Sequence, residues 1–209
     1  MVNYHQQYFE HIERGYYPFS YLRDKIIVNL IKKLIPFGCR ILEFGCGTGR
    51  LITKLELHYE TYGIDISHYA ISRAQEKSKT TKFYYSLDDF LLLKKHIDCI
   101  LAINVIEHIE NPEGLLKKFN LILKKFGHLF IHLPVSSNQL SKYLVKKFYN
   151  DETHVFVPSI DELDAILFDN GFKLVHRRSG SFIFLPISIK NIIKITPCYL
   201  GIYKKDNEV

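Results

Sequence analysis

Three glycines, Gly45, Gly47 and Gly49, alternate with other residues in the stretch ILEFGCGTGR (41–50), directly after a short apolar run. Glycine permits tight turns and lets a ligand lie directly against backbone N–H groups. Glu43 stands just before the glycines, where its charge would repel a pyrophosphate and attract an ammonium group. The spacing also differs from the G-x-G-x-x-G pattern of dinucleotide sites. We therefore expect the ligand to be a cationic amino-acid conjugate and not NAD.

Acidic side chains end the next two apolar runs. Asp65, in YGIDIS, follows the glycines by about 20 residues, where a carboxylate can accept hydrogen bonds from both hydroxyls of a ribose. The alternative is a helix N-cap, a role that Ser67 could fill instead. Asp88 or Asp89, in YYSLDDF, could accept a hydrogen bond from an exocyclic adenine amine, and a helix cap is again the competing interpretation.

Glu107 and His108 follow a further apolar run, at the place where a substrate should approach. An imidazole can take a proton near neutral pH. His108 is therefore our candidate general base for a hydroxyl acceptor. The competing interpretation is a structural histidine that forms a hydrogen bond at a helix start.

An alternation of strands and helices must position these side chains. Near-continuous apolar runs predict strands covered on both faces, which is typical of a parallel sheet. The expected strands are 39–44, 60–64, 82–86, 97–103, 127–133, 172–178 and 198–205. Helices are expected at about 48–57, 67–78, 113–125 and 158–171, and in a tyrosine-rich N-terminal segment that ends near Lys33. In the helix at 158–171, Ser159 and Glu162 form a capping-box pattern, and Gly171 supplies the stop.

Together these segments resemble the class I S-adenosylmethionine-dependent methyltransferases, in the group of small-molecule enzymes that includes the ubiquinone-biosynthesis methyltransferases. The matching segments follow the family's order over about residues 20–178: ILEFGCGTG, YGIDIS, DCILAINVIEHIENP, GHLFIHLP and an H-x-F-x-P-S pattern from His154. The resemblance implies an α/β fold with a Rossmann-like, doubly wound, seven-stranded and mostly parallel sheet. The last strand is then antiparallel, and helices cover both faces. S-adenosylmethionine is the implied cofactor and S-adenosylhomocysteine its product.

The resemblance also implies which residues surround the methionine, ribose, adenine and sulfonium parts of the cofactor. That set is Arg23, Glu43, Gly45, Cys46, Gly47, Gly49, Asp65, Ile66, Leu87, Asp88, Ile103 and Asn104. We expect Glu107 and His108 to be catalytic, and Tyr17 and His154 to bind substrate. Some relatives bind a divalent cation through an E-x-x-E-H motif here, but this chain has Asn104 in place of the first acid. Because losing one charged ligand weakens a Mg²⁺-type site, we expect no metal.

Composition restricts the class of protein further. The chain has 209 residues, with 28 Lys and Arg against 22 Asp and Glu and a net charge of +6. The lysines are scattered mostly as pairs, which is typical of solvated helix faces, so we do not expect a nucleic-acid partner. We find no membrane-spanning run and no export signal. The four cysteines lie far apart without metal or redox spacing. We expect a cytoplasmic monomer or homodimer.

We expect one methyltransferase domain, 1–209, with an N-terminal helical cap (1–37) and two substrate-side insertions (134–157 and 180–197). The acceptor is expected to be O or N of a small metabolite. The apolar segment SFIFLPISIKNII (181–193) favours an apolar or aromatic acceptor. The alternatives are an RNA methyltransferase and a non-catalytic subunit that binds S-adenosylmethionine for a partner. An NAD-dependent Rossmann enzyme is disfavoured by the glycine spacing and by Glu43.

Overall fold

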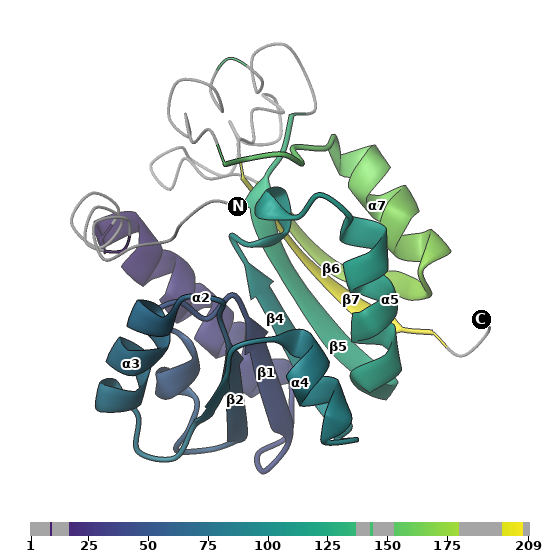
Figure 1. Cartoon of the computed structure of the whole chain (residues 1–209). Coiled ribbons are helices and arrows are strands. Elements are labelled where there is room, and N and C mark those ends of the chain that lie inside the picture. Colours follow the sequence, from purple (N-terminus) through teal and green to yellow (C-terminus); the bar gives the residue numbers. More distant parts are fainter. Residues whose placement is uncertain (1–8, 10–16, 137–142, 144–152, 180–197, 207–209) are drawn as a thin grey trace. The chain divides into compact units, whose positions relative to one another are not determined.

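A computed structural model of the chain describes residues 9, 17–136, 143, 153–179 and 198–206 (Figure 1). The chain divides into two compact units, Met1–Leu101 and Ala102–Val209. The single domain with its cap and two insertions stays a prediction, since 180–197 and most of 134–157 lie outside the described residues. No helix in the described parts is long and apolar enough to cross a membrane.

The first unit is built on parallel strands. They are β1 (Arg40–Phe44), β2 (Glu60–Ile64) and β3 (Lys82–Tyr84), and β4 (Ile97–Ile103) starts in the same unit. The helical elements are α2 (Tyr17–Leu34), the 3₁₀ helix η1 (Ile52–Lys54), α3 (His68–Lys77) and α4 (Leu87–Leu92). The register pairs Glu43 with Gly63 and Phe44 with Ile64. Strands β1 and β2 therefore end level with each other, and the glycine turn and Asp65 follow at the same edge.

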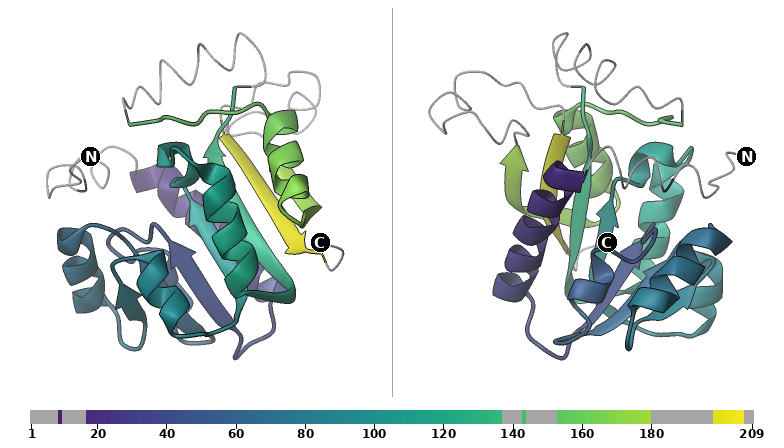
Figure 2. Two further views of the ribbon diagram at one scale, coloured as in Figure 1. Left: turned by 45° about the vertical axis from the view of Figure 1, so that its right-hand side comes forward. Right: turned by 90° about the vertical axis from the view of Figure 1, so that its left-hand side faces the viewer.

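The second unit contains η2 (Ile106–His108), α5 (Pro112–Ile122), β5 (Leu123–Pro134), α7 (Ile160–Asp169), β6 (Phe172–Ser179) and β7 (Cys198–Lys205). Strand β7 is antiparallel to both β5 and β6. The Tyr203 hydroxyl of β7 donates to Asp164 of α7 at 2.6 Å. Asn120 of α5 donates to the carbonyl of Asn170, directly after α7, at 2.9 Å. Helices α5 and α7 consequently lie next to each other beside these strands (Figures 1 and 2).

The strands form one seven-stranded sheet in the order β3-β2-β1-β4-β5-β7-β6. This order, with β7 as the antiparallel strand, confirms the expected fold class. Strands β2, β4 and β7 have the bounds expected from the sequence. The capping box is also confirmed, because Ser159 Oγ accepts from Glu162 N–H while the Glu162 side chain accepts from Ser159 N–H.

The expected helix at 48–57 is wrong, because only the 3₁₀ helix η1 forms there. Lys54 N–H donates to Leu51 O at 3.1 Å and Leu55 N–H to Ile52 O at 3.0 Å, both from residue i to i−3, and the i to i−4 bond from Thr53 N–H to Gly49 O at 3.1 Å is not continued. The Glu43 carboxylate accepts from Ile52 N–H at 3.0 Å. A buried side chain therefore takes the N–H that a continuous α-helix would use.

Several other element boundaries also differ from expectation. Helix α5 ends at Ile122 and β5 begins at Leu123, so the end of the expected helix at 113–125 is strand. The strand expected at 82–86 stops at Tyr84. Ser86 instead caps the unexpected helix α4, because its Oγ accepts from Asp89 N–H at 3.0 Å.

Candidate active site

The glycine turn is attached to the end of β2 by backbone hydrogen bonds. The N–H groups of Gly45 and Cys46 both donate to Ile64 O, at 2.8 and 2.9 Å. Gly45, Gly47 and Gly49 have φ values of 71°, 51° and 73°, a left-handed conformation that glycine adopts at little cost. Cys46 is buried in the turn, and burial raises the pKa of its thiol. It is therefore a neutral thiol, which makes a poor nucleophile.

Asp65 holds this turn to the start of α3. Its carboxylate accepts from Gly47 N–H at 2.8 Å through one oxygen and from Ser67 N–H at 2.9 Å through the other. Burial raises the pKa of Asp65 despite these two hydrogen bonds. Ser67 is the N-cap of α3, with its Oγ accepting from Ala70 N–H. The capping role proposed as an alternative for Asp65 thus belongs to Ser67, and the two Asp65 oxygens retain lone pairs that can accept hydroxyl groups.

Glu43 is almost completely enclosed, with 4% of its surface exposed. Burial raises its pKa to about 8, and the negative charge of Asp24 contributes in the same direction. The hydrogen bond from Ile52 N–H and the charges of Arg23 and Arg50 oppose that rise. A cationic ligand next to Glu43 would stabilise the ionised form of its carboxyl group, because a nearby positive charge favours that form.

The remaining predicted adenosine contacts of the first unit lie close together in the chain. Ile66 directly follows Asp65 and is 64% exposed, so its side chain offers an apolar surface. Leu87 is buried at the start of α4, whereas Asp88 is exposed in the first turn of that helix. Ser86, not Asp88, caps α4. The part of Asp88 in binding stays a prediction.

In the second unit, Asn104 follows β4 with an unusual backbone. Its φ is 54°, a left-handed value that only a few per cent of non-glycine residues adopt. Its N–H donates to His132 O at 2.7 Å, and its side-chain oxygen forms a hydrogen bond with His132 Nδ1. Ile103 is buried beside it in the chain. Sequence reasoning missed His132, although the two imidazoles, His128 and His132, within the otherwise apolar run GHLFIHL were a visible signal.

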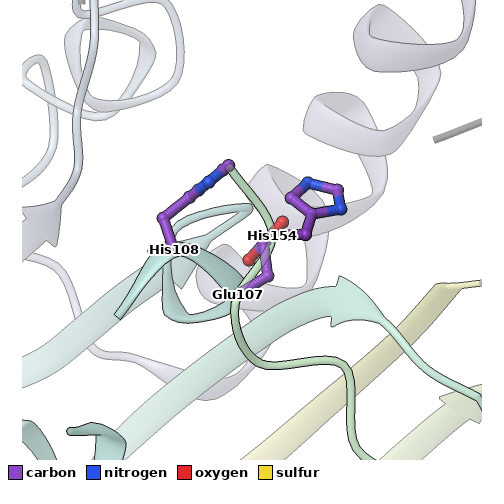
Figure 3. Close-up of side chains that lie close together, drawn as sticks. All are labelled: Glu107, His108 and His154. Atoms are coloured by element: carbon purple, nitrogen blue, oxygen red, sulfur yellow. The ribbon is translucent and has the colours of Figure 1, made fainter. Parts of the chain in front are cut away.

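The structure brings His154 to Glu107 and His108, which lie far from it in the chain (Figure 3). Glu107 is buried, and its backbone carbonyl accepts from Val155 N–H at 2.8 Å and Phe156 N–H at 3.0 Å. These bonds align the segment after Thr153 with η2. The His108 and His154 rings are consequently 4.9 Å apart between centroids.

One ring nitrogen of His108 is tied to the same segment. Its Nδ1 lies 2.8 Å from Thr153 Oγ1 and 3.2 Å from Thr153 O. A carbonyl oxygen can only accept a hydrogen bond. The contact with Thr153 O therefore favours the tautomer with the proton on Nδ1, which leaves the lone pair on Nε2.

Glu107, His108 and His154 could hold a metal ion, since one ligand atom of each lies within 4.8 Å of the others. One carboxylate and two imidazoles are a donor set that suits transition metals better than Mg²⁺. The absence of a functional metal was expected from Asn104 and stays a prediction. Tyr17 begins α2, but its side chain lies outside the described residues.

Comparison with known proteins identifies relatives over most of the chain. A family model described as a methyltransferase domain matches residues 9–177. A ubiquinone biosynthesis O-methyltransferase of Pelagibacter ubique is 23% identical over 174 residues, which cover 69% of this chain and 72% of that protein. An uncharacterized methyltransferase of Bacillus mycoides is 27% identical over 181 residues, covering 80% and 83% of the two chains.

Solved structures share the fold. The magnesium protoporphyrin IX methyltransferase of Synechocystis, crystallised with S-adenosylhomocysteine, has a TM-score of 0.68 at 18% identity, over 90% of this chain and 84% of that chain. The N-methyltransferase NodS of Bradyrhizobium japonicum, in complex with S-adenosylhomocysteine, has a TM-score of 0.67 at 18% identity, over 91% and 89%.

Proposed function

Because the chain belongs to the methyltransferase domain family, it is a methyltransferase, and we propose the following reaction for it. It moves the methyl group of S-adenosylmethionine to O or N of a small, apolar or aromatic metabolite. The main support for S-adenosylmethionine as the cofactor is the position of two acids, Asp65 and Glu43, at the glycine turn. Asp65 accepts from Gly47 N–H inside the turn, and Glu43 accepts from Ile52 N–H just after it.

These residues fit the chemistry of the cofactor. The amino-acid part of S-adenosylmethionine carries an ammonium group, and its ribose carries two hydroxyls. Glu43 is buried with a pKa raised to about 8 despite the charges of Arg23 and Arg50, so an ammonium group beside it would favour its ionised form. Asp65 is held by two N–H groups, and its oxygens can accept the ribose hydroxyls. Ile66 would pack on the adenine, and Asp88 would accept its amine.

When bound, S-adenosylmethionine supplies an electrophilic methyl group on a sulfonium, which a nucleophile displaces in line. The chain itself must then orient the acceptor and, for a hydroxyl, remove its proton. We propose His108 Nε2 as the base, because Nδ1 is engaged with Thr153. Glu107 would stabilise the resulting imidazolium, since its carboxylate lies in the same cluster. His154 would contact the acceptor.

The apolar character of the acceptor rests on residues 181–193, which lie outside the described residues. Two further considerations support a small acceptor over RNA. The basic residues are scattered, and nucleic-acid sites usually gather them on one face. The Pelagibacter relative is named as an enzyme of ubiquinone biosynthesis.

The first experiment is calorimetric titration of the purified protein with S-adenosylmethionine, S-adenosylhomocysteine and NAD. We expect the first two to bind and NAD not to bind. Asp65→Asn should lose affinity for both sulfur ligands, whereas Asp169→Asn, at an exposed acid of α7, serves as the matched control. Binding of NAD alone would refute the proposal.

Turnover is the second part of the test. Once binding is established, phenols, amines and carboxylic acids are screened as methyl acceptors, and the formation of S-adenosylhomocysteine is measured for each. Methylation of a phenol or amine would support the proposal. Binding without turnover of any acceptor would favour a non-catalytic subunit, and salt-sensitive RNA methylation would favour the RNA enzyme.

A further inference from the structure

Asp24 is a buried carboxylate that no sequence pattern singled out. It lies on α2 with none of its surface exposed, and three cations surround it. Arg23 Nη2 lies 3.0 Å from Oδ1, and Arg50 Nε and Lys54 Nζ each lie 3.2 Å from Oδ2. Burying a charge is costly unless it is paired. Here one carboxylate meets three positive charges, so the cluster has more positive charge than Asp24 alone requires.

The cluster joins α2 to the segment that follows the glycine turn. Arg50 comes directly after Gly49, and Lys54 is the last residue of η1. Arg50 also donates from Nη1 to Ser20 Oγ on α2. A guanidinium that is engaged through two nitrogens has a defined orientation. Asp24 and Ser20 therefore determine where the Arg50 side chain lies next to the turn.

The same groups determine the charge state of Glu43. Asp24 raises the pKa of Glu43, whereas Arg23 and Arg50 lower it. Burial raises the pKa of the nearby Cys46 thiol, which is therefore neutral. The charges named here as raising or lowering the Glu43 pKa thus come from Asp24 and Arg23 on α2 and from Arg50, directly after the glycine turn.

We propose that Asp24 is a positioning residue for the amino-acid part of the cofactor. It holds Arg23 and Arg50 beside Glu43 and does not contact the cofactor itself. This inference rests on the proposed function, and in particular on S-adenosylmethionine as the cofactor. The amino-acid part carries both an ammonium and a carboxylate. Glu43 suits the ammonium group, and a pair of oriented guanidinium groups suits the carboxylate.

The test uses two ligands that differ in the amino-acid part. S-adenosylhomocysteine has that part, and 5′-methylthioadenosine lacks it but keeps the adenosine. Asp24→Asn preserves the shape of the side chain and removes its charge. We expect it to weaken S-adenosylhomocysteine about tenfold, as the loss of one hydrogen bond to a charged group would, and to leave methylthioadenosine binding unchanged. Lys25→Gln, at the exposed neighbour on α2, is the control.

Proton release gives an independent readout. With a pKa of about 8, Glu43 is mostly protonated at pH 7 in the free protein, and an ammonium group drives its ionisation. Calorimetry at pH 7 in two buffers of different ionisation enthalpy should therefore detect protons released by S-adenosylhomocysteine. Arg50→Gln removes a positive charge, so the release should not fall.

Three outcomes would overturn the inference. These are equal losses of affinity for both ligands in Asp24→Asn, unchanged binding of both in that variant, and a lower proton release in Arg50→Gln than in the wild type. If Asp24→Asn does not fold, Arg50→Gln is tested in its place. It must weaken S-adenosylhomocysteine more than methylthioadenosine, and the inference fails if both ligands are affected equally. Failure of the wild-type protein to bind either ligand would refute the proposed function instead, which separates the two results.

Discussion

Replacing Gly49 by alanine should destabilise the protein in a way that the structure makes measurable. Gly49 has a φ of 73°, and a Cβ built on it would lie 2.9 Å from the Cβ of Ala74 and 3.3 Å from Thr53 Cγ2. Gly38 offers a matched control, because its φ is 84° but a Cβ there would meet nothing within 4 Å. The two positions share the backbone cost and differ in the steric cost.

The magnitudes follow from these two terms. A left-handed φ costs an alanine roughly 1–2 kcal/mol. An extra methyl group in a filled space adds about 1–3 kcal/mol. Gly38→Ala should therefore lower the free energy of unfolding by about 1–2 kcal/mol, and Gly49→Ala by about 2–5 kcal/mol. The reduced freedom of the unfolded chain offsets a part of both values equally.

Urea unfolding of the single variants and of Gly49→Ala combined with Ala74→Gly gives the steric term directly. Ala74→Gly alone should cost about 2 kcal/mol, because it lowers helix propensity and removes a buried methyl group. In the double variant the new methyl group can occupy the vacated space. We expect a favourable coupling energy of about 1–3 kcal/mol. Equal losses for Gly38→Ala and Gly49→Ala, or no coupling with Ala74→Gly, would refute the reasoning.

Three further predictions concern ionisable groups. Burial raises the pKa of Glu56, but hydrogen bonds from Ser78, Thr81 and the backbone between them outweigh it, so the pKa is lowered overall. Its stabilising effect is present above the unfolded pKa near 4.5 and is lost as pH falls; the difference in unfolding free energy between wild type and Glu56→Gln should shrink from pH 7 to pH 3. His108→Gln should lower kcat about a hundredfold or more for a hydroxyl acceptor while leaving S-adenosylhomocysteine affinity unchanged, and an unchanged kcat would remove it as the base. EDTA should leave methyl transfer unchanged, whereas a loss of activity that an added divalent ion restores would show that Glu107 and its histidine neighbours hold a functional metal.

Local patterns were sufficient for most of the fold. Apolar runs marked all seven strands among the described residues, and the capping box at Ser159 placed the start of α7. These features depend on residues close together in the chain, so the sequence displays them directly. The same local reasoning failed at 48–57. There a glutamate nine residues before Ile52 takes its N–H, and helix periodicity carries no sign of such a contact.

The sequence by itself was sufficient to predict the class of ligand and the class of reaction. The glycine spacing and Glu43 indicated a cationic amino-acid conjugate, Asp65 indicated a ribose, and the order of the motifs indicated a methyltransferase, which the family match confirms. Tertiary structure decided which groups act together. It brought Asp24 to Arg50, His132 to Asn104, and His154 to Glu107 and His108. Each pair is separated by many residues, and such contacts exist only once strands and helices have packed, because burial then forces each polar group to find a partner.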